Sequence, residues 1–227
     1  MSTPPPGIYR QTHHVLLRLA HWSMALAILI MTGSGWRIYN QEPILPFRFP
    51  VMFTLGGEIK ATLSRSNDPG VANAISWHFA GMWLLGAAFL LFMAYGFISG
   101  HFRRNLLPLT PKLFIRDFIA AATFKLSHAL GEYNAVQRAF YWGVFFAIFM
   151  MIMSGLAIWK PVQLWWITAL LGGFQGARIV HFLFMSAIVG FVLVHLALVA
   201  LVPKTLVSMI TGSATEIVPP ENLAEGH

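Results

Sequence analysis

Four histidines of this sequence lie within or at the edges of long apolar segments: His21, His78, His181 and His195. An ionisable side chain is costly in apolar surroundings such as a bilayer and is usually paired there, so each of the four is a candidate functional residue. The alternative is a neutral ring that is hydrogen-bonded to a neighbouring backbone group or hydroxyl. Because one isolated histidine fits both interpretations, the relative positions of the four rings have to decide between them.

His181 and His195 bound the run HFLFMSAIVGFVLVHL and are fourteen residues apart. On a helix this separation corresponds to a rise of about 21 Å and to a rotation about 40° short of four full turns. Both rings therefore face the same side of the helix, but they lie near its opposite ends. Since they are too far apart to bind one ion, the spacing predicts two separate centres.

The elements that must position these rings are membrane spans. Of the 227 residues, 57% are hydrophobic and only 10% are charged, which is typical of membrane proteins. Four stretches contain no Asp, Glu, Lys or Arg: 19–36, 69–102, 139–159 and 179–203. A helix of roughly 20 apolar residues crosses a bilayer core. We therefore expect an all-α integral membrane four-helix bundle, with spans at about 12–36, 71–102, 135–159 and 178–202.

These spans form a single predicted domain at 1–210, followed by a polar tail at 211–227. The first span is interpreted as an uncleaved anchor, because Thr32–Trp36 is a poor cleavage site for a signal peptide. The connection 103–134 contains the run PKLFIRDFIAAATFKL, which predicts a further helix. This helix would lie in the membrane interface or pack on the end of the bundle. The loop 37–72 is long enough to receive a partner protein.

The distribution of Lys and Arg predicts the orientation of the bundle. Nine of these cations fall on the side of the two termini, and six fall on the opposite side. Cytoplasmic segments carry the excess of positive charge, so both termini are expected in the cytoplasm. The cations follow the loops and form no basic stripe, so we expect no binding of nucleic acid.

With this orientation, the depths of the histidines define two pairs. His21 lies in the inner half of the first span, at the level of His195, and His78 lies near the outer start of the second, at the level of His181. Two facing imidazoles suit the iron of haem, whereas a structural zinc ion takes four ligands. The chain has no cysteine, which excludes iron–sulfur clusters and covalently attached haem. The pattern predicts two b-type haems stacked across the bilayer.

Two further groups of residues suit a bound macrocycle. Small residues that would leave room for it occur beside the histidines: Gly33, Gly35, Gly81, Gly86 and Gly190. Arg18 and Arg178 lie one turn from His21 and His181, where a guanidinium could pair with a haem propionate. Either arginine could equally be a simple anchor at the membrane surface.

At these positions the sequence resembles the di-haem cytochrome b subunits of thiosulfate reductase, nickel–iron hydrogenase and formate dehydrogenase. The matching segments are RLAHW at 18–22, WHF at 77–79, YNAVQR at 133–138, SGLAIWKPVQLWW at 154–166, and ARIVHF at 177–182. The tryptophan-rich segment resembles most the thiosulfate-reductase-like branch, which is associated with molybdenum enzymes. The resemblance implies the same axial pairs, His21 with His195 and His78 with His181.

The resemblance also implies a quinone site beside the inner haem, at Asn134 and, with less support, at Tyr133 and Gln137. An asparagine at the start of a helix can also be its N-cap, and one residue could serve both roles. The implied location is a bacterial inner membrane. The implied partner is a periplasmic redox subunit, a molybdoenzyme or an iron–sulfur protein. In hydrogenase-type members, a helix of the partner contacts the outer haem.

These observations predict a membrane cytochrome b that carries electrons between the quinone pool and a periplasmic partner. As an electron-transfer subunit it need not contain the site that transforms the substrate. One alternative is a stand-alone cytochrome b561-type protein that exchanges electrons between quinone and a small species such as superoxide. Another is a transporter or channel without haem, in which the histidines relay protons. An absorption spectrum separates this last alternative from the others.

Overall fold

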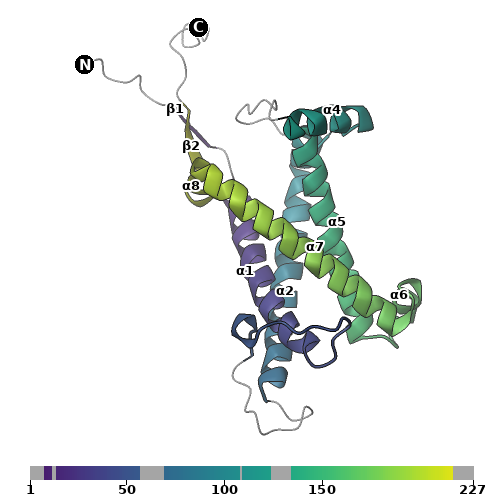
Figure 1. Cartoon of the computed structure of the whole chain (residues 1–227). Helices are drawn as coiled ribbons and strands as arrows, with labels where there is room; N and C mark the ends of the chain where they lie inside the picture. Colours follow the sequence, from purple (N-terminus) through teal and green to yellow (C-terminus); the bar gives the residue numbers. More distant parts are fainter. Residues whose placement is uncertain (1–7, 12–13, 57–68, 108, 124–133, 217–227) are drawn as a thin grey trace, which may run out of the picture.

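A computed structural model describes residues 8–11, 14–56, 69–107, 109–123 and 134–216 (Figure 1). Within these residues, four helices are long and apolar enough to cross a membrane. They are α1 (Val15–Tyr39), α2 (Pro69–Ile98), α5 (Ala135–Trp159) and α7 (Gly173–Leu201). The prediction of an all-α membrane bundle with four spans is therefore confirmed.

Shorter elements complete the two ends of the bundle. They are η1 (Val51–Phe53), α3 (His101–Asn105), α4 (Pro111–Ala122), α6 (Trp165–Leu170) and α8 (Pro203–Thr211). In addition, β1 (Ile8–Gln11) pairs antiparallel with β2 (Ser213–Glu216), with Ile8 opposite Glu216. This pairing brings the segments near the two termini together at one end of the bundle (Figure 1).

Glycines in the left-handed conformation mark two helix boundaries that differ from the expected ones. Gly100 has a φ of 66°, and α2 ends before it at Ile98 rather than at about 102. Gly172 has a φ of 83°, and α7 begins directly after it at Gly173 rather than at about 178. The absence of a Cβ makes this conformation inexpensive for glycine, so the chain can change direction there. The first turn of α7 extends the last span beyond its uncharged stretch.

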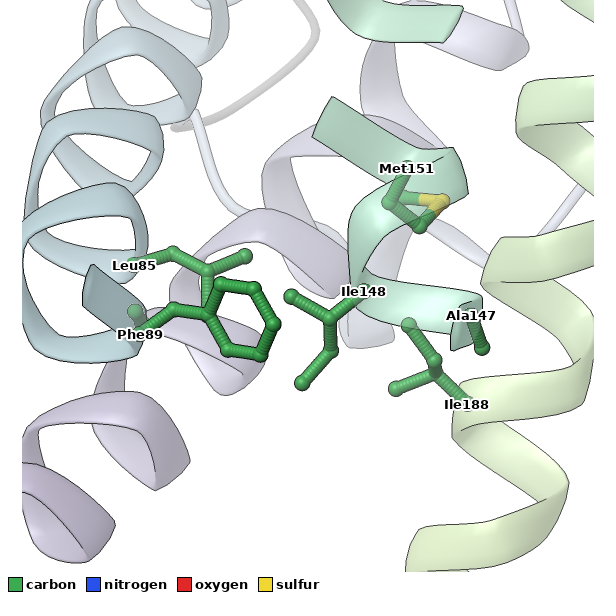
Figure 2. Packing of buried hydrophobic residues seen from close by; sticks show 7 residues of the cluster. Leu85, Phe89, Ala147, Ile148, Met151 and Ile188 are labelled. Carbon is green, nitrogen blue, oxygen red and sulfur yellow. The ribbon is translucent and has the colours of Figure 1, made fainter. Parts of the chain in front are cut away.

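The four long helices pack as two pairs, α1 with α2 and α5 with α7, whereas close backbone contacts between the pairs are sparse. Side chains join the pairs at mid-height, where Leu85 and Phe89 of α2 point toward Ile148 of α5 (Figure 2). Ala27 of α1 and Ile188 of α7 belong to the same buried cluster. The bundle therefore has an apolar layer at its middle, where side chains of both helix pairs meet.

The helix α4 lies across the end of α5 and is tied to it by a carboxylate (Figure 1). Asp117 accepts a hydrogen bond of 2.9 Å from the backbone N–H of Ala135, the first residue of α5, and another from Arg116. These contacts lower the pKa of the Asp117 carboxyl below its ordinary value. The apolar side chains of Ile115 and Phe118 are exposed on α4. The helix thus packs on the bundle end and also presents apolar side chains that suit a membrane interface.

We expect Asp117→Ala to loosen α4 from α5, because the N–H of Ala135 loses a charged acceptor. Loss of such a bond corresponds to roughly 1 kcal/mol, or to about fivefold faster opening. Hydrogen exchange of peptides that cover α4 measures this opening. Asp117→Asn keeps a neutral acceptor oxygen and should have a smaller effect. In the wild-type protein, the depressed pKa means that this contribution is complete above the ordinary carboxyl value of 3.8 and is lost as the pH falls below it. Unchanged exchange in both variants would contradict the assignment.

Candidate functional site

The structure brings the four membrane histidines together as two facing pairs. The ring centres of His21 on α1 and His195 on α7 are 6.2 Å apart, and the two planes are inclined by 59°. The ring centres of His78 on α2 and His181 on α7 are 6.3 Å apart, with an inclination of 62°. These are the two pairings expected from depth, and α7 contributes one ring to each. Following the orientation expected from the sequence, His21 and His195 are called the inner pair, and His78 and His181 are called the outer pair.

The separation of the rings suits one metal ion between each pair. A bond from a metal to an imidazole nitrogen is about 2 Å, and the nitrogen is about 1 Å from the ring centre, so two rings on one ion have centres about 6 Å apart. Among the described residues, no group of three or more His, Cys, Asp or Glu side chains could hold a metal ion. Each pair therefore fits an ion whose other ligands come from a macrocycle, as in haem, and does not fit a four-ligand zinc site.

A buried serine lies within hydrogen-bond distance of Nδ1 in each outer imidazole. The Oγ of Ser34 on α1 is 3.1 Å from Nδ1 of His78, and the Oγ of Ser154 on α5 is 3.0 Å from Nδ1 of His181. Each serine hydroxyl also lies within hydrogen-bond distance of the carbonyl four residues earlier, at Ile30 and at Met150. Both serines are completely buried. The same contact thus occurs in both helix pairs: a serine of α1 contacts the histidine of α2, and a serine of α5 contacts the histidine of α7.

These contacts favour one position for the proton of each outer imidazole, because the donor in a contact between serine and histidine depends on the histidine tautomer. A serine hydroxyl has a single proton, and its shortest contact is with the carbonyl four residues earlier. With the proton donated there, the Oγ atom accepts from the imidazole, and Nδ1 of His78 and of His181 carries a proton. The lone pair is left on Nε2, which is the nitrogen that a neutral histidine uses to bind a metal when Nδ1 is hydrogen-bonded.

The glycines expected to leave room for a macrocycle have different surroundings. A Cβ at Gly35 would stand 3.3 Å from Cε1 of His78, so this glycine lets α1 approach the ring. Gly33 packs on Leu55, and Gly81 packs on Met31 where α1 meets α2. A Cβ at Gly86 or Gly190 would meet nothing within 4 Å. Only these last two have open space beside them, while the others serve close packing.

Gly155 on α5 repeats the contact of Gly35, because a Cβ there would stand 3.3 Å from Cε1 of His181. Sequence reasoning missed the serines that precede these two glycines. The available signal was a Ser-Gly dipeptide inside both the first and the third span, at Ser34-Gly35 and Ser154-Gly155. A polar residue in an apolar span requires a partner, but the sequence does not show which one.

The inner pair lies between aromatic side chains. The ring of His195 stacks on Phe191 at 5.8 Å, and the ring of His21 meets Trp22 edge-on at 5.4 Å. The indole of Trp22 reaches the carbonyl of Met209 in α8. The end of α8 therefore packs beside the inner pair.

Both predicted propionate ligands have protein partners in the structure. Arg18 donates to the carbonyls of Ile210 and Thr211 at the C-terminal end of α8. Arg178 donates to the side chain of Gln175 and forms an ion pair with Glu42 at 3.5 Å. Cations near the C-terminal end of a helix are favourable, so α8 accounts for Arg18 without a ligand. Binding of propionates by Arg18 and Arg178 stays a prediction.

Another arginine is more deeply buried than either of these. Arg37 lies one turn beyond Ser34 on α1 and is only 1% exposed. A guanidinium buried in the outer half of a membrane bundle requires compensation by polar or anionic groups. From the sequence, Arg37 is one of the six cations assigned to the side opposite the termini, because its position at the end of the span is compatible with exposure.

The predicted quinone residues have a clear structural role at the start of α5. The side chain of Asn134 accepts from the N–H of Gln137 at 2.9 Å, and the side chain of Gln137 accepts from the N–H of Asn134 at 3.1 Å. This reciprocal arrangement is a capping box. Tyr133 lies outside the described residues. A role of these three residues in quinone binding therefore stays a prediction.

An apolar groove of about 480 Å³ lies between α5 and α7, close to this helix start. It begins at Ala139 and Phe140, within one turn of Gln137, and Phe114 of α4 forms part of its edge. On the α7 side its lining includes Phe191, whose ring stacks on His195. The groove thus connects the start of α5 with the surroundings of the inner histidine pair.

Comparisons with known proteins agree with this geometry. The family profile described as prokaryotic cytochrome b561 matches residues 12–212. A putative protein-methionine-sulfoxide reductase subunit of Azospira oryzae is 43% identical over 201 residues, which cover 88% of this chain and 96% of that protein. A probable Ni/Fe-hydrogenase B-type cytochrome subunit of Bradyrhizobium diazoefficiens is 24% identical over 209 residues, which cover 84% of this chain and 77% of that protein.

The profile match extends over all four spans and over both histidine pairs, and the first relative aligns with most of the chain. The resemblance to cytochrome b subunits is thereby confirmed, and so is the multi-pass membrane location. The chain belongs to the prokaryotic cytochrome b561 family of haem-binding membrane proteins that transfer electrons.

Proposed function

We propose that this protein is a di-haem cytochrome b that carries electrons between the quinone pool and a redox subunit outside the membrane. The observation that carries the proposal is the presence of two facing imidazole pairs, with ring centres 6.2 Å and 6.3 Å apart. His21 and His195 would hold the inner haem, and His78 and His181 would hold the outer one. Haem iron supplies reversible uptake of one electron, with a potential that the protein tunes.

The residues of the chain position the two centres and separate them by a buried apolar layer. The cluster that includes Ile148 and Ile188 lies between the two histidine levels and excludes water from the middle of the bundle. Ile188 is seven residues from each histidine of α7, about halfway between them. Buried Arg37 is a further candidate for compensating a propionate of the outer haem, beside the predicted Arg18 and Arg178.

We place the quinone site at the inner end, in the groove between α5 and α7. The groove is apolar and has a volume within the usual range of small-molecule sites. A quinone there would lie beside Phe191 and near Asn134 and Gln137. Oxidation of a quinol to the quinone releases two electrons and two protons, and a haem held by His21 and His195 would accept these electrons one at a time. Reduction of quinone would use the same path in reverse.

The orientation proposed from the distribution of Lys and Arg puts both termini in the cytoplasm. The outer end of the bundle would then face the periplasm, together with the segment 40–56 that follows α1. This segment is held in place, because the side chain of Asn40 bonds both the N–H and the carbonyl of Phe49 at 2.9 Å. The N–H of Leu55 also bonds the carbonyl of Gly33.

Aromatic contacts connect this segment with the outer histidine pair. Phe182, the neighbour of His181, stacks on Tyr39 at 5.1 Å and lies 6.4 Å from Phe47. Phe47, Met52 and Phe53 are exposed, and Met52 is the most exposed of them at 82%. A partner that docks on segment 40–56 would therefore approach the outer haem.

The name of the Azospira oryzae relative suggests the class of partner. That protein is described as a putative subunit of a protein-methionine-sulfoxide reductase. We propose that the present chain likewise supplies electrons to a periplasmic reductase of this kind, which would be a molybdoenzyme of the class expected from the sequence. Reduction of a sulfoxide to a thioether consumes two electrons and two protons and releases water, which balances the oxidation of one quinol.

The first experiment is the absorption spectrum and the haem content of the purified protein and its histidine variants. We expect two haems per chain and a reduced b-type spectrum. His181→Ala and His195→Ala should each lose about one haem, and the components that they lose should differ, because the two rings serve different centres. A colourless protein would favour the transporter, and loss of the same component in both variants would contradict the pairing.

A bulky side chain placed in the groove tests whether the quinone binds there. Ala187 lines the groove, whereas Ser186 beside it does not. We expect Ala187→Phe to slow the reduction of haem by a quinol at least about tenfold, which corresponds to about 1.4 kcal/mol of lost binding. The spectrum obtained with dithionite should stay unchanged. Ser186→Phe is the matched control, and equal rates in the two variants would place the quinone elsewhere.

The docking surface is tested by co-purification of a periplasmic redox subunit with the tagged protein. We expect Met52→Glu to reduce its recovery, because a buried apolar contact would be replaced by a charge. The haem spectrum should not change. Val162→Glu introduces the same charge at a similarly exposed residue outside segment 40–56, and it should have a smaller effect. If no redox subunit is recovered with the wild-type protein, a stand-alone cytochrome is favoured.

A further inference from the structure

Each outer histidine has a serine hydroxyl at Nδ1, and a hydrogen bond at this nitrogen changes the basicity of the imidazole. Nδ1 of His78 is held by Ser34, and Nδ1 of His181 is held by Ser154, at 3.1 Å and 3.0 Å. On the inner pair, His195 instead has the ring of Phe191 stacked against it. The outer pair thus has a polar, hydrogen-bonded contact behind both of its rings.

Each outer contact is part of a short chain of hydrogen bonds. The imidazole N–H donates to the serine Oγ, and the serine O–H donates to a helix carbonyl, over 2.7 Å to Ile30 or 2.6 Å to Met150. Consecutive hydrogen bonds polarise one another, and the effect is larger in surroundings of low dielectric. The polarisation moves electron density toward Nε2, the ring nitrogen that is left to bind a metal.

We propose that Ser34 and Ser154 are positioning residues that lower the reduction potential of the outer haem selectively. The inference rests on the proposed two-haem function. A histidine whose second N–H is hydrogen-bonded is a more basic ligand. A more basic ligand stabilises ferric iron more than ferrous iron, so the potential falls. Hydrogen bonds around the ligands are one of the means by which a protein tunes its haem.

The adjacent glycines fix the geometry on which this effect depends. The hypothetical Cβ atoms at Gly35 and Gly155 would each stand 3.3 Å from Cε1 of the supported ring. A contact this short would push the ring away from the neighbouring serine. Gly35 and Gly155 therefore keep each imidazole within hydrogen-bond distance of Ser34 or Ser154.

The two serines should act on the same iron. Ser34 contacts His78 from α1, and Ser154 contacts His181 from α5, and these two histidines would hold the proposed outer haem. Their effects on the potential should therefore have the same sign, and both should appear in the same haem component. A role limited to packing would not predict that two residues on different helices move one potential and leave the other unchanged.

The experiment is a spectroelectrochemical titration of the full-length protein with its haems. The outer component is identified as the one that His181→Ala loses. In Ser34→Ala and in Ser154→Ala we expect the midpoint potential of this component to rise, and in the double variant it should rise further. The potential of the inner component should stay at the wild-type value.

Two helix serines provide matched controls. Ser76 on α2 and Ser186 on α7 are exposed and donate to their own helix, at the carbonyls of Ala72 and Phe182. They lie within five residues of His78 and His181, so Ser76→Ala and Ser186→Ala make the same chemical change nearby. Neither should shift a potential. Ser154→Thr keeps the hydroxyl and should leave the outer potential close to the wild-type value.

The outcomes separate the inference from the function on which it rests. Unchanged outer potentials in both alanine variants would overturn the inference, as would equal shifts of both haem components. If an alanine variant loses the outer haem, retention of that haem in the matching threonine variant supports the inference, and its loss there overturns it. A wild-type protein with one haem would instead refute the proposed function.

Discussion

The constraint on which the structure depends is that a neutral imidazole inside a membrane needs a partner for each of its two nitrogens. For His78 and His181, one nitrogen is paired by a serine of the adjacent helix. The two rings also face each other across the bundle, with centres 6.3 Å apart. The contacts with the serines require two helices to approach closely, which the glycines after the serines permit. The separation of the two rings would leave room for a metal ion that both histidines bind.

This combination explains the division of the bundle into two helix pairs. Within each pair the backbones are close, whereas between the pairs side chains meet in the apolar layer around Leu85 and Ile148 (Figure 2). Aromatic rings also join the pairs, as at Tyr39 and Phe182. Binding to the folded state alone stabilises that state, so a bound haem and the bundle would stabilise each other.

The two ends of the molecule differ in the groups that surround the histidines. At the inner end, Arg18 of the first helix donates to the C-terminal carbonyls of α8, and the groove between α5 and α7 reaches Phe191. At the outer end, segment 40–56 is fixed by Asn40 and carries exposed aromatic side chains. A lipid-soluble redox partner suits the first surface, and a protein suits the second. The choice of redox partners would then depend on the two ends of the bundle, while the helices between them position the histidine pairs.

The four spans, the relative depths of the histidines and the two pairs could be predicted from the sequence. These properties follow from the regular rise and rotation of a helix, which are local. The groups that contact each ring depend on the tertiary structure: Ser34 and Ser154 contact histidines of other helices, and Arg18 and Arg178 have protein partners. It also showed that Arg37 is buried and that Asn134 and Gln137 form a capping box. Such contacts depend on which side chains of two helices meet, and a pattern along one helix does not contain that information.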